Sequence, residues 1–231
     1  DGTDPKTGYH FVDLEKRAED CGSVRELMEL YKQTLDYFMG LQVETEHIND
    51  EIHIQQDINA FRSSLVYDCI ERAMDLVEGG SVYSADGGPT AGTISAGDSL
   101  AALDEIVFNQ KLLTMEQVLH AMSTNYEDME TVPAGPEIRA ILLNKAPKFG
   151  NDDERADKWV VELEDYIGSS YRYKYRSSKY GKGPVPCCYS YSQSPVTGNI
   201  AFGKSIGATP DGRKAGQPVN NGISPANGSE K

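Results

Sequence analysis

The stretch GKSIGATPDGRKAGQP, residues 203–218, is the most informative part of this sequence. Glycine and proline recur every few residues in it, which predicts an irregular loop rather than a helix or a strand. Asp211 and Gly212 suit a tight turn, and the guanidinium group of Arg213 suits a paired contact with a carboxylate. Long irregular segments are uncommon in compact domains unless they serve a site or contact another surface. We therefore expect Asp211, Gly212 and Arg213 to hold the shape of a loop rather than to carry out catalysis.

Three upstream stretches join this loop in one collinear pattern. They are residues 147–153 (PKFGNDD), residues 98–103 (DSLAAL) and residues 68–83 (DCIERAMDLVEGGSVY). In order and spacing, the four stretches resemble motifs of the pyruvate formate-lyase superfamily of glycyl radical enzymes. The Gly-Gly-Ser-Val-Tyr block that ends at Tyr83 resembles the glycerol dehydratase-like branch in particular. The resemblance extends over nearly the whole chain, and four motifs in order are specific where one alone would be weak.

The resemblance implies a fold and a type of chemistry. The fold is helix-rich α/β, and the chain would form part of a ten-stranded α/β barrel. The parent enzyme would be an anaerobic, cytoplasmic homodimer that breaks a C–O, C–C or C–N bond of a small organic substrate, as a dehydratase or decarboxylase does. Its glycyl radical would be installed by a radical S-adenosylmethionine activating enzyme, and no other cofactor is expected to bind. An acyltransferase like pyruvate formate-lyase, a fumarate-adding synthase and a non-catalytic scaffold that needs partner chains remain the alternatives.

The sequence departs from the family pattern at its reactive residues. It contains no Gly-Cys-x-Glu motif, and the pair Cys187–Cys188 lies just before residues 203–218, whereas the family's catalytic cysteine lies well upstream. We therefore do not assign Cys187 or Cys188 as the radical pair. The resemblance implies that the cysteine loop precedes Asp1 and that the glycyl loop follows Lys231. We expect the chain alone to be catalytically inactive and to contribute barrel wall and substrate pocket.

Several other residues are candidates for binding or structural roles. The resemblance implies that residues near the ends of the expected strands 81–84 and 185–191 line the substrate pocket, so Tyr83, Tyr191 and Ser192 are candidate substrate contacts. A packed core tyrosine is the alternative for Tyr83. Asn151 and Asp152 precede a helix, and we interpret them as capping and loop-bracing residues.

The resemblance implies that residues 1–231 are a segment of one pyruvate formate-lyase-like domain, and periodicity and capping signals divide this segment into three parts. Residues 1–22 form a connector, residues 23–182 are mainly helical, and residues 183–231 combine a strand with the long loop. Capping boxes at Ser23/Glu26 and Thr114/Gln117 begin two of the helices. The expected helices start at about residues 23, 63, 98, 114, 137 and 152, and the expected strands cover residues 81–84 and 185–191. The first helix should reach about residue 58, the second should end at Gly79 in a left-handed cap, and the last should bury Trp159, Val160, Leu163 and Ile167.

Composition excludes several classes of protein. The chain has 231 residues, of which 39% are hydrophobic and 25% charged, and its net charge is −14. This is a globular composition too acidic for a nucleic-acid-binding surface, and no apolar run is long enough to span a membrane. The basic stretch 172–182 is interpreted as a solvated surface. The four cysteines fit no zinc or disulfide pattern and are expected to be free thiols, and His47 and His53 are not spaced as metal ligands on one helical face.

Overall fold

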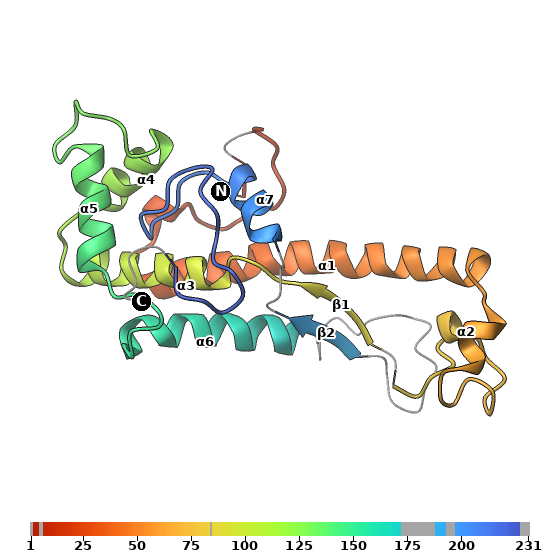
Figure 1. Cartoon of the computed structure of the whole chain (residues 1–231). Coiled ribbons are helices and arrows are strands. Elements are labelled where there is room, and N and C mark those ends of the chain that lie inside the picture. Colours follow the sequence, from red (N-terminus) through yellow and green to blue (C-terminus); the bar gives the residue numbers. More distant parts are fainter. Residues whose placement is uncertain (1, 5–6, 84, 172–187, 193–196, 227–231) are drawn as a thin grey trace. The chain divides into compact units, whose positions relative to one another are not determined.

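A computed structural model describes residues 2–4, 7–83, 85–171, 188–192 and 197–226 (Figure 1). The chain forms two compact units. Unit 1 comprises Asp1–Thr34, Pro89–Asp165 and Gln193–Lys231, and unit 2 comprises Leu35–Gly88 and Tyr166–Ser192. The described part is helix-rich, with one sheet of two strands. Its elements are η1 (Ala18–Asp20), α1 (Val24–Gln56), α2 (Ala60–Ser64), η2 (Leu76–Glu78), β1 (Ala85–Pro89), α3 (Thr93–Ala102), the π-helical η3 (Leu103–Asn109), α4 (Met115–Ser123), α5 (Gly135–Lys145), α6 (Glu154–Ser169), β2 (Cys188–Ser192) and α7 (Gly198–Ser205).

Local capping signals placed several helices correctly. α1 begins directly after Ser23, whose hydroxyl accepts the Glu26 backbone N–H at 3.3 Å, and it ends at Gln56, close to the expected end. α4 begins after Thr114. The Thr114 hydroxyl accepts the Gln117 N–H at 3.2 Å, and the Gln117 side-chain oxygen accepts the Thr114 N–H at 2.9 Å. These helices were predictable because the capping residues lie within three positions of one another.

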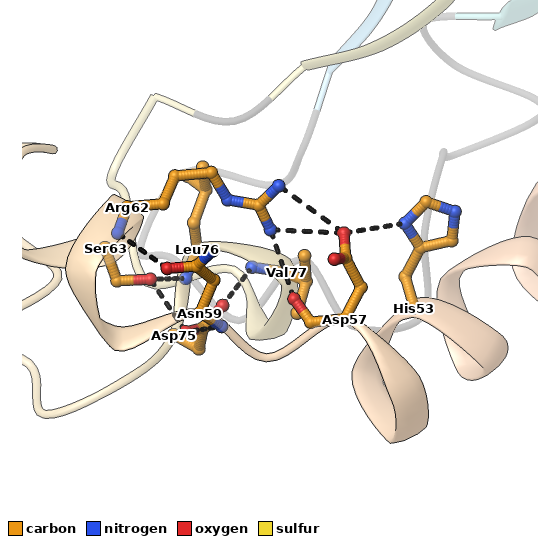
Figure 2. Close-up of polar contacts among 8 residues, drawn as sticks. All are labelled: His53, Asp57, Asn59, Arg62, Ser63, Asp75, Leu76 and Val77. Carbon is orange, nitrogen blue, oxygen red and sulfur yellow. Dashed lines mark hydrogen bonds and ion pairs between the residues drawn. The ribbon is translucent and has the colours of Figure 1, made fainter.

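The helix expected over residues 63–78 is wrong. Only Ala60–Ser64 and Leu76–Glu78 are helical, and between them Asp68 and Ala73 adopt the left-handed values φ 75° and 50°. The reason is a set of hydrogen bonds that converge on Asp75 and hold the segment in a compact turn (Figure 2). Its carboxylate accepts the Ser63 hydroxyl at 2.8 Å and the backbone N–H groups of Asn59 and Val77 at 3.0 and 3.1 Å. Gly79 does form the predicted left-handed cap, at φ 83°.

Asp75 is therefore expected to hold residues 57–80 in place. Burial would raise the pKa of Asp75, but the hydrogen bonds from Ser63, Val77 and Asn59 outweigh it and lower the pKa. Asp75→Ala should lower the local opening free energy of this segment by about 2–4 kcal/mol, because one hydrogen bond to a charged group contributes roughly 1.5–3 kcal/mol net and bonds that share one carboxylate are not additive. Hydrogen exchange of the amides of residues 57–80 measures this. Asp57→Ala, which removes a half-exposed partner of Arg62, is the control and should change exchange little; equal effects would contradict the role of Asp75.

The expected start of the next helix is also wrong. α3 begins at Thr93 rather than at Asp98, and the chain turns into it at Gly92, which has φ 93°. The Ser95 N–H donates to Oδ1 of Asn220 at 3.0 Å, so one N–H group in the first turn of α3 has a partner 125 positions away. The strand expected at residues 81–84 occurs instead at Ala85–Pro89, as β1.

The C-terminal region matches the sequence expectation in part. β2 at Cys188–Ser192 overlaps the expected strand and pairs with β1, and residues 206–226 are irregular. Gly198–Ser205 is helical, although the sequence predicted a loop there. The basic stretch 172–182 and residues 183–187 lie outside the described residues.

Each unit has its own apolar core. In unit 1, helices η3, α4 and α5 pack around fully buried side chains that include Ile106, Val118, Tyr126 and Leu142. In unit 2, Met39 and Val43 of α1 pack against Ile167 and Tyr171. The predicted core face of α6 is confirmed, because Trp159, Val160, Leu163 and Ile167 are all buried. α1 and the other described helices lack the long apolar stretch that a membrane-spanning helix requires.

Gly97 lets α3 approach α6 closely within unit 1. A Cβ atom at Gly97 would lie 2.4 Å from Cγ2 of Val160 and 3.2 Å from its Cα. Gly97→Ala should therefore lower the free energy of unfolding by about 1–3 kcal/mol through overpacking. Urea denaturation followed by fluorescence of Trp159, the only tryptophan of the chain, measures the change. Gly168→Ala, a helical glycine with open space around its Cβ position, is the control and should stabilise by up to about 1 kcal/mol.

Candidate functional site

A buried cluster of charged side chains lies in unit 1. It consists of Asp98 from α3, Lys148 from the loop before α6, and Asp211 and Arg213 from the loop after α7, none of them more than 2% exposed. Charged groups are rarely buried to this extent unless they are paired or hydrogen-bonded. The cluster is therefore a part of the chain in which buried charges need specific hydrogen-bond or ionic partners.

Arg213 organises the loop through its side-chain donors. Its guanidinium group donates to the backbone carbonyl oxygens of Gln217 at 2.7 Å, Lys214 at 3.1 Å and Gly207. Nε donates to the hydroxyl of Thr209 at 3.2 Å. Within the described residues its side-chain hydrogen bonds all go to these neutral oxygens, whereas the sequence predicted a carboxylate partner. Arg213 binds carbonyl groups because the backbone of an irregular loop leaves them without regular partners, and a side chain with five donors can satisfy several of them at once.

Asp211 and Gly212 form the tight turn of this loop. Oδ1 of Asp211 accepts the Thr209 hydroxyl at 2.5 Å and the Arg213 N–H at 3.3 Å, and Gly212 adopts φ 91°. The backbone of the turn is tied to the rest of unit 1. Lys148 Nζ donates to the Asp211 carbonyl at 2.7 Å and Arg139 Nε to the Gly212 carbonyl at 2.9 Å.

Asp98 connects α3 to the loop before α6. Its Oδ1 accepts the Phe149 N–H at 2.7 Å. The second carboxylate oxygens of Asp98 and Asp211 are buried and have no hydrogen-bond partner among the described residues. Burial raises the pKa of Asp98 to about 7, with the neighbouring Lys148 acting in the opposite direction. Burial also lowers the pKa of Lys148.

An apolar cavity of about 430 Å³ opens in the same unit and shares Thr209 with the loop. Its walls come from α1, α3 and the loop after α7, and they are mostly aliphatic. Tyr31, Ser95 and Ser99 add hydroxyl groups to the wall. This combination of an apolar wall with a few hydroxyl groups is typical of sites that hold small organic groups.

The residues predicted to contact substrate lie in unit 2. Tyr83 is 90% exposed and lies two positions before β1. Tyr191 and Ser192 are the last two residues of β2, which pairs with β1. Strand pairing thus brings the three predicted positions onto or beside one two-stranded sheet. Tyr83 is not packed in a core, which was the alternative for it.

The other predicted positions are also placed by the structure. Asn151 and Asp152 are exposed, and the side-chain contact at the start of α6 is made by Asp153, whose Oδ1 accepts the Arg155 N–H at 3.0 Å. The sequence expectation that Asn151 and Asp152 cap this helix is therefore shifted by one residue, and Asp152 adopts φ 55° just before it. Cys188 is the first residue of β2, whereas Cys187 lies outside the described residues. Cys21 and Cys69 are buried free thiols.

Sequence reasoning missed the roles of Asp98 and Lys148. Both lie in motifs that carry the family resemblance, but neither was assigned a buried charge. A signal was present for Asp98, because an aspartate among small and apolar residues such as Gly97, Leu100 and Ala101 is out of place on an apolar helix face. No three or more His, Cys, Asp or Glu side chains are arranged to hold a metal ion in the part of the chain that the structure describes.

Comparison with known proteins gives a consistent result. A family model described as "Pyruvate formate lyase-like" matches residues 1–202. The chain is 32% identical over 232 residues to a probable dehydratase, YbiW, of Escherichia coli K12, a match that covers 99% of this chain and 28% of the relative. It is 33% identical over 212 residues to trans-4-hydroxy-L-proline dehydratase of Clostridioides difficile, covering 90% of this chain and 25% of the relative.

A solved structure agrees with these matches. The glycerol-bound B12-independent glycerol dehydratase from Clostridium butyricum superposes with a TM-score of 0.85 and 30% identity, covering 97% of this chain and 27% of that protein. The chain thus spans about a quarter of the length of the relatives it matches. On the family model and these relatives together, the chain belongs to the pyruvate formate lyase-like family of glycyl radical enzymes.

Proposed function

We propose that this chain is part of the catalytic subunit of a glycyl radical dehydratase that removes water from a small hydroxylated substrate. One observation carries the proposal: the chain superposes over 97% of its length on a glycerol dehydratase, with a TM-score of 0.85. The two sequence relatives described above are also named as dehydratases. In this proposal the chain forms part of the wall of a ten-stranded α/β barrel that encloses the reaction and excludes water.

In this proposal, the radical-bearing residues lie in the three quarters of the enzyme that this chain does not match. The chain's own contribution is to shape and orient. Tyr83, Tyr191 and Ser192 each carry a hydroxyl group and lie on or beside paired strands, so they are the candidates to hydrogen-bond the hydroxyl groups of the substrate. Such residues can accelerate the reaction by holding the leaving hydroxyl group in one orientation. The buried Arg213 cluster serves to fix the loop, as the sequence suggested, and not to contact substrate.

Anaerobic activation tests the proposed function. The protein is expressed from its native gene together with a radical S-adenosylmethionine activating enzyme, and electron paramagnetic resonance is recorded before glycerol, 1,2-propanediol or trans-4-hydroxy-L-proline is added. A glycyl radical signal and a dehydrated product are expected. A radical signal with acyl transfer or fumarate addition instead would replace the dehydratase assignment by one of those activities. Absence of any radical under conditions that activate a known relative would support the scaffold alternative.

Substitution of Tyr83 tests the substrate contact. Tyr83→Phe should lower kcat/KM by roughly 10–100-fold, because loss of one well-placed hydrogen bond to a reacting group costs about 1.5–3 kcal/mol. The radical signal should keep its amplitude, because Tyr83 is not expected to affect activation. Tyr67→Phe, at a 92% exposed tyrosine that belongs to neither strand, is the matched control. If Tyr83→Phe and Tyr67→Phe have the same kcat/KM, Tyr83 does not bind substrate.

A further inference from the structure

An exposed apolar stripe runs along the part of α1 that belongs to unit 2. Phe38, Leu41, Ile48 and Ile52 are 43–52% exposed. Thr45, between Leu41 and Ile48, is exposed as well. The positions 38, 41, 45, 48 and 52 are separated by alternating steps of three and four residues. This is the heptad spacing that places side chains on one seam of a helix that packs against another helix.

The stripe is distinct from the face of α1 that packs in the core of unit 2. Met39 and Val43 are 4% and 7% exposed and contact Ile167 and Tyr171. α1 therefore carries two apolar faces in this region, of which one is already buried. Single exposed apolar side chains are ordinary on protein surfaces, but a regular seam over four turns is a feature of helices that have a partner.

The charges beside the stripe indicate what kind of partner fits. In the heptad register, Glu44 and Glu51 flank one edge of the stripe, and Gln42, Asn49 and Gln56 flank the other. Residues 33–61 contain no lysine or arginine. The same stripe on a second copy of the chain would bring the same acidic edge and could offer no lysine or arginine to Glu44. A helix with lysine or arginine beside its own apolar seam would be complementary.

We propose that residues 38–52 of α1 dock an amphipathic helix whose apolar seam is flanked by lysine or arginine, supplied by the polypeptide that makes up the remainder of the pyruvate formate lyase-like enzyme. The matched relatives are about four times as long as the region they share with this chain, so most of such an enzyme lies outside the matched part. The inference rests on the proposed function, because it requires the part of the enzyme that lies outside the matched region. It names the surface where the remainder packs.

Site-specific photo-crosslinking tests the docking surface. A benzoylphenylalanine residue is placed at Ile48 in the protein expressed from its native gene, and the adduct is identified by mass spectrometry. The expected adduct is a peptide from outside residues 1–231, with an apolar heptad pattern flanked by lysine or arginine. The control position is Gln33, which is exposed on the same helix but off the stripe. Its adduct yield should be at least about five-fold lower, because the anchor side chains of an interface lie at its centre.

Substitutions of Glu44 test whether charge contributes to docking. With the photoreactive residue at Ile48, Glu44→Lys should lower the adduct yield by about ten-fold at low salt, and Glu44→Gln should lower it less. Glu44 is exposed, so the helix content measured by circular dichroism should not change. An adduct with residues 38–52 of a second copy, an adduct peptide without basic residues, or no adduct above the Gln33 level would overturn the proposal. The yield needs neither a radical nor turnover, so an inactive protein with the expected adduct contradicts only the proposed dehydratase function, and an active enzyme without it contradicts only the docking.

Discussion

Arg213→Ala is expected to lower the free energy of unfolding of unit 1 by about 3–5 kcal/mol. The side chain is fully buried, and it satisfies the carbonyl oxygens of Gly207, Lys214 and Gln217. Alanine would leave these oxygens in the interior without donors, which is the expensive way to lose a hydrogen bond. Arg213→Lys keeps the charge but not the planar fork, so it should still lose roughly 2–3 kcal/mol.

Urea denaturation followed by Trp159 fluorescence measures both changes. Lys214→Ala is the matched control, because it removes the neighbouring cation, whose ion pair with Glu127 lies at the surface. It should lose less than about 1 kcal/mol. If Arg213→Ala and Lys214→Ala have the same midpoint, the loop does not depend on the buried guanidinium group.

Asp98→Asn is expected to flatten the dependence of stability on pH. The pKa of Asp98 is raised from 3.8 to about 7 in the folded chain, chiefly by burial. A group with a raised folded pKa contributes stability that is fully present below about pH 4 and is lost as the pH rises through about 7. The loss reaches at most about 4 kcal/mol, since each pKa unit corresponds to 1.36 kcal/mol. Among the described residues of unit 1, Lys148 lowers the pKa of Asp98, and Asp211 and Asp157 raise it.

The variant isolates this effect because asparagine keeps an oxygen that can accept the Phe149 N–H. The free energy of unfolding of the original chain should fall by up to a few kcal/mol between pH 5 and 7.5, and that of Asp98→Asn should fall by less. Urea titrations at a series of pH values measure the slope. Asp165→Asn, at an exposed carboxylate of α6, should leave the slope as it is. A steeper fall in Asp98→Asn than in the original chain would contradict the raised pKa.

The sequence predicted those parts of the fold in which cause and effect are close in the chain. The capping box of Thr114 and Gln117 and the apolar face of α6 are local patterns, and both are confirmed. The start of α3 was not predictable in this way, because Asn220, 125 residues away, accepts the Ser95 N–H in its first turn. The expected helix over residues 63–78 failed for a related reason. The helical periodicity is present, but Asp75 accepts the Val77 N–H that a helix would have used, and it also binds the Ser63 hydroxyl and the Asn59 N–H.

The candidate site was predictable to a lesser degree. The family resemblance singled out the motifs that contain Asp98, Lys148, Asp211 and Arg213, and it placed Asp211 and Arg213 in a structural loop. It could not indicate that Arg213 binds carbonyl oxygens, because that depends on the path of an irregular backbone. Whether Tyr83, Tyr191 and Ser192 contact substrate stays a prediction for the kinetic test described above.

The anchoring of the turn at Asp211 also indicates how far along the chain its folding unit extends. The family model stops at residue 202, yet Tyr126 donates to the Thr209 carbonyl at 2.7 Å and Lys148 to that of Asp211. A polypeptide shortened to the matched range would retain both donors in its interior and lose both acceptors. The range that the family model matches is thus shorter than the range that the chain needs to satisfy its own buried polar groups.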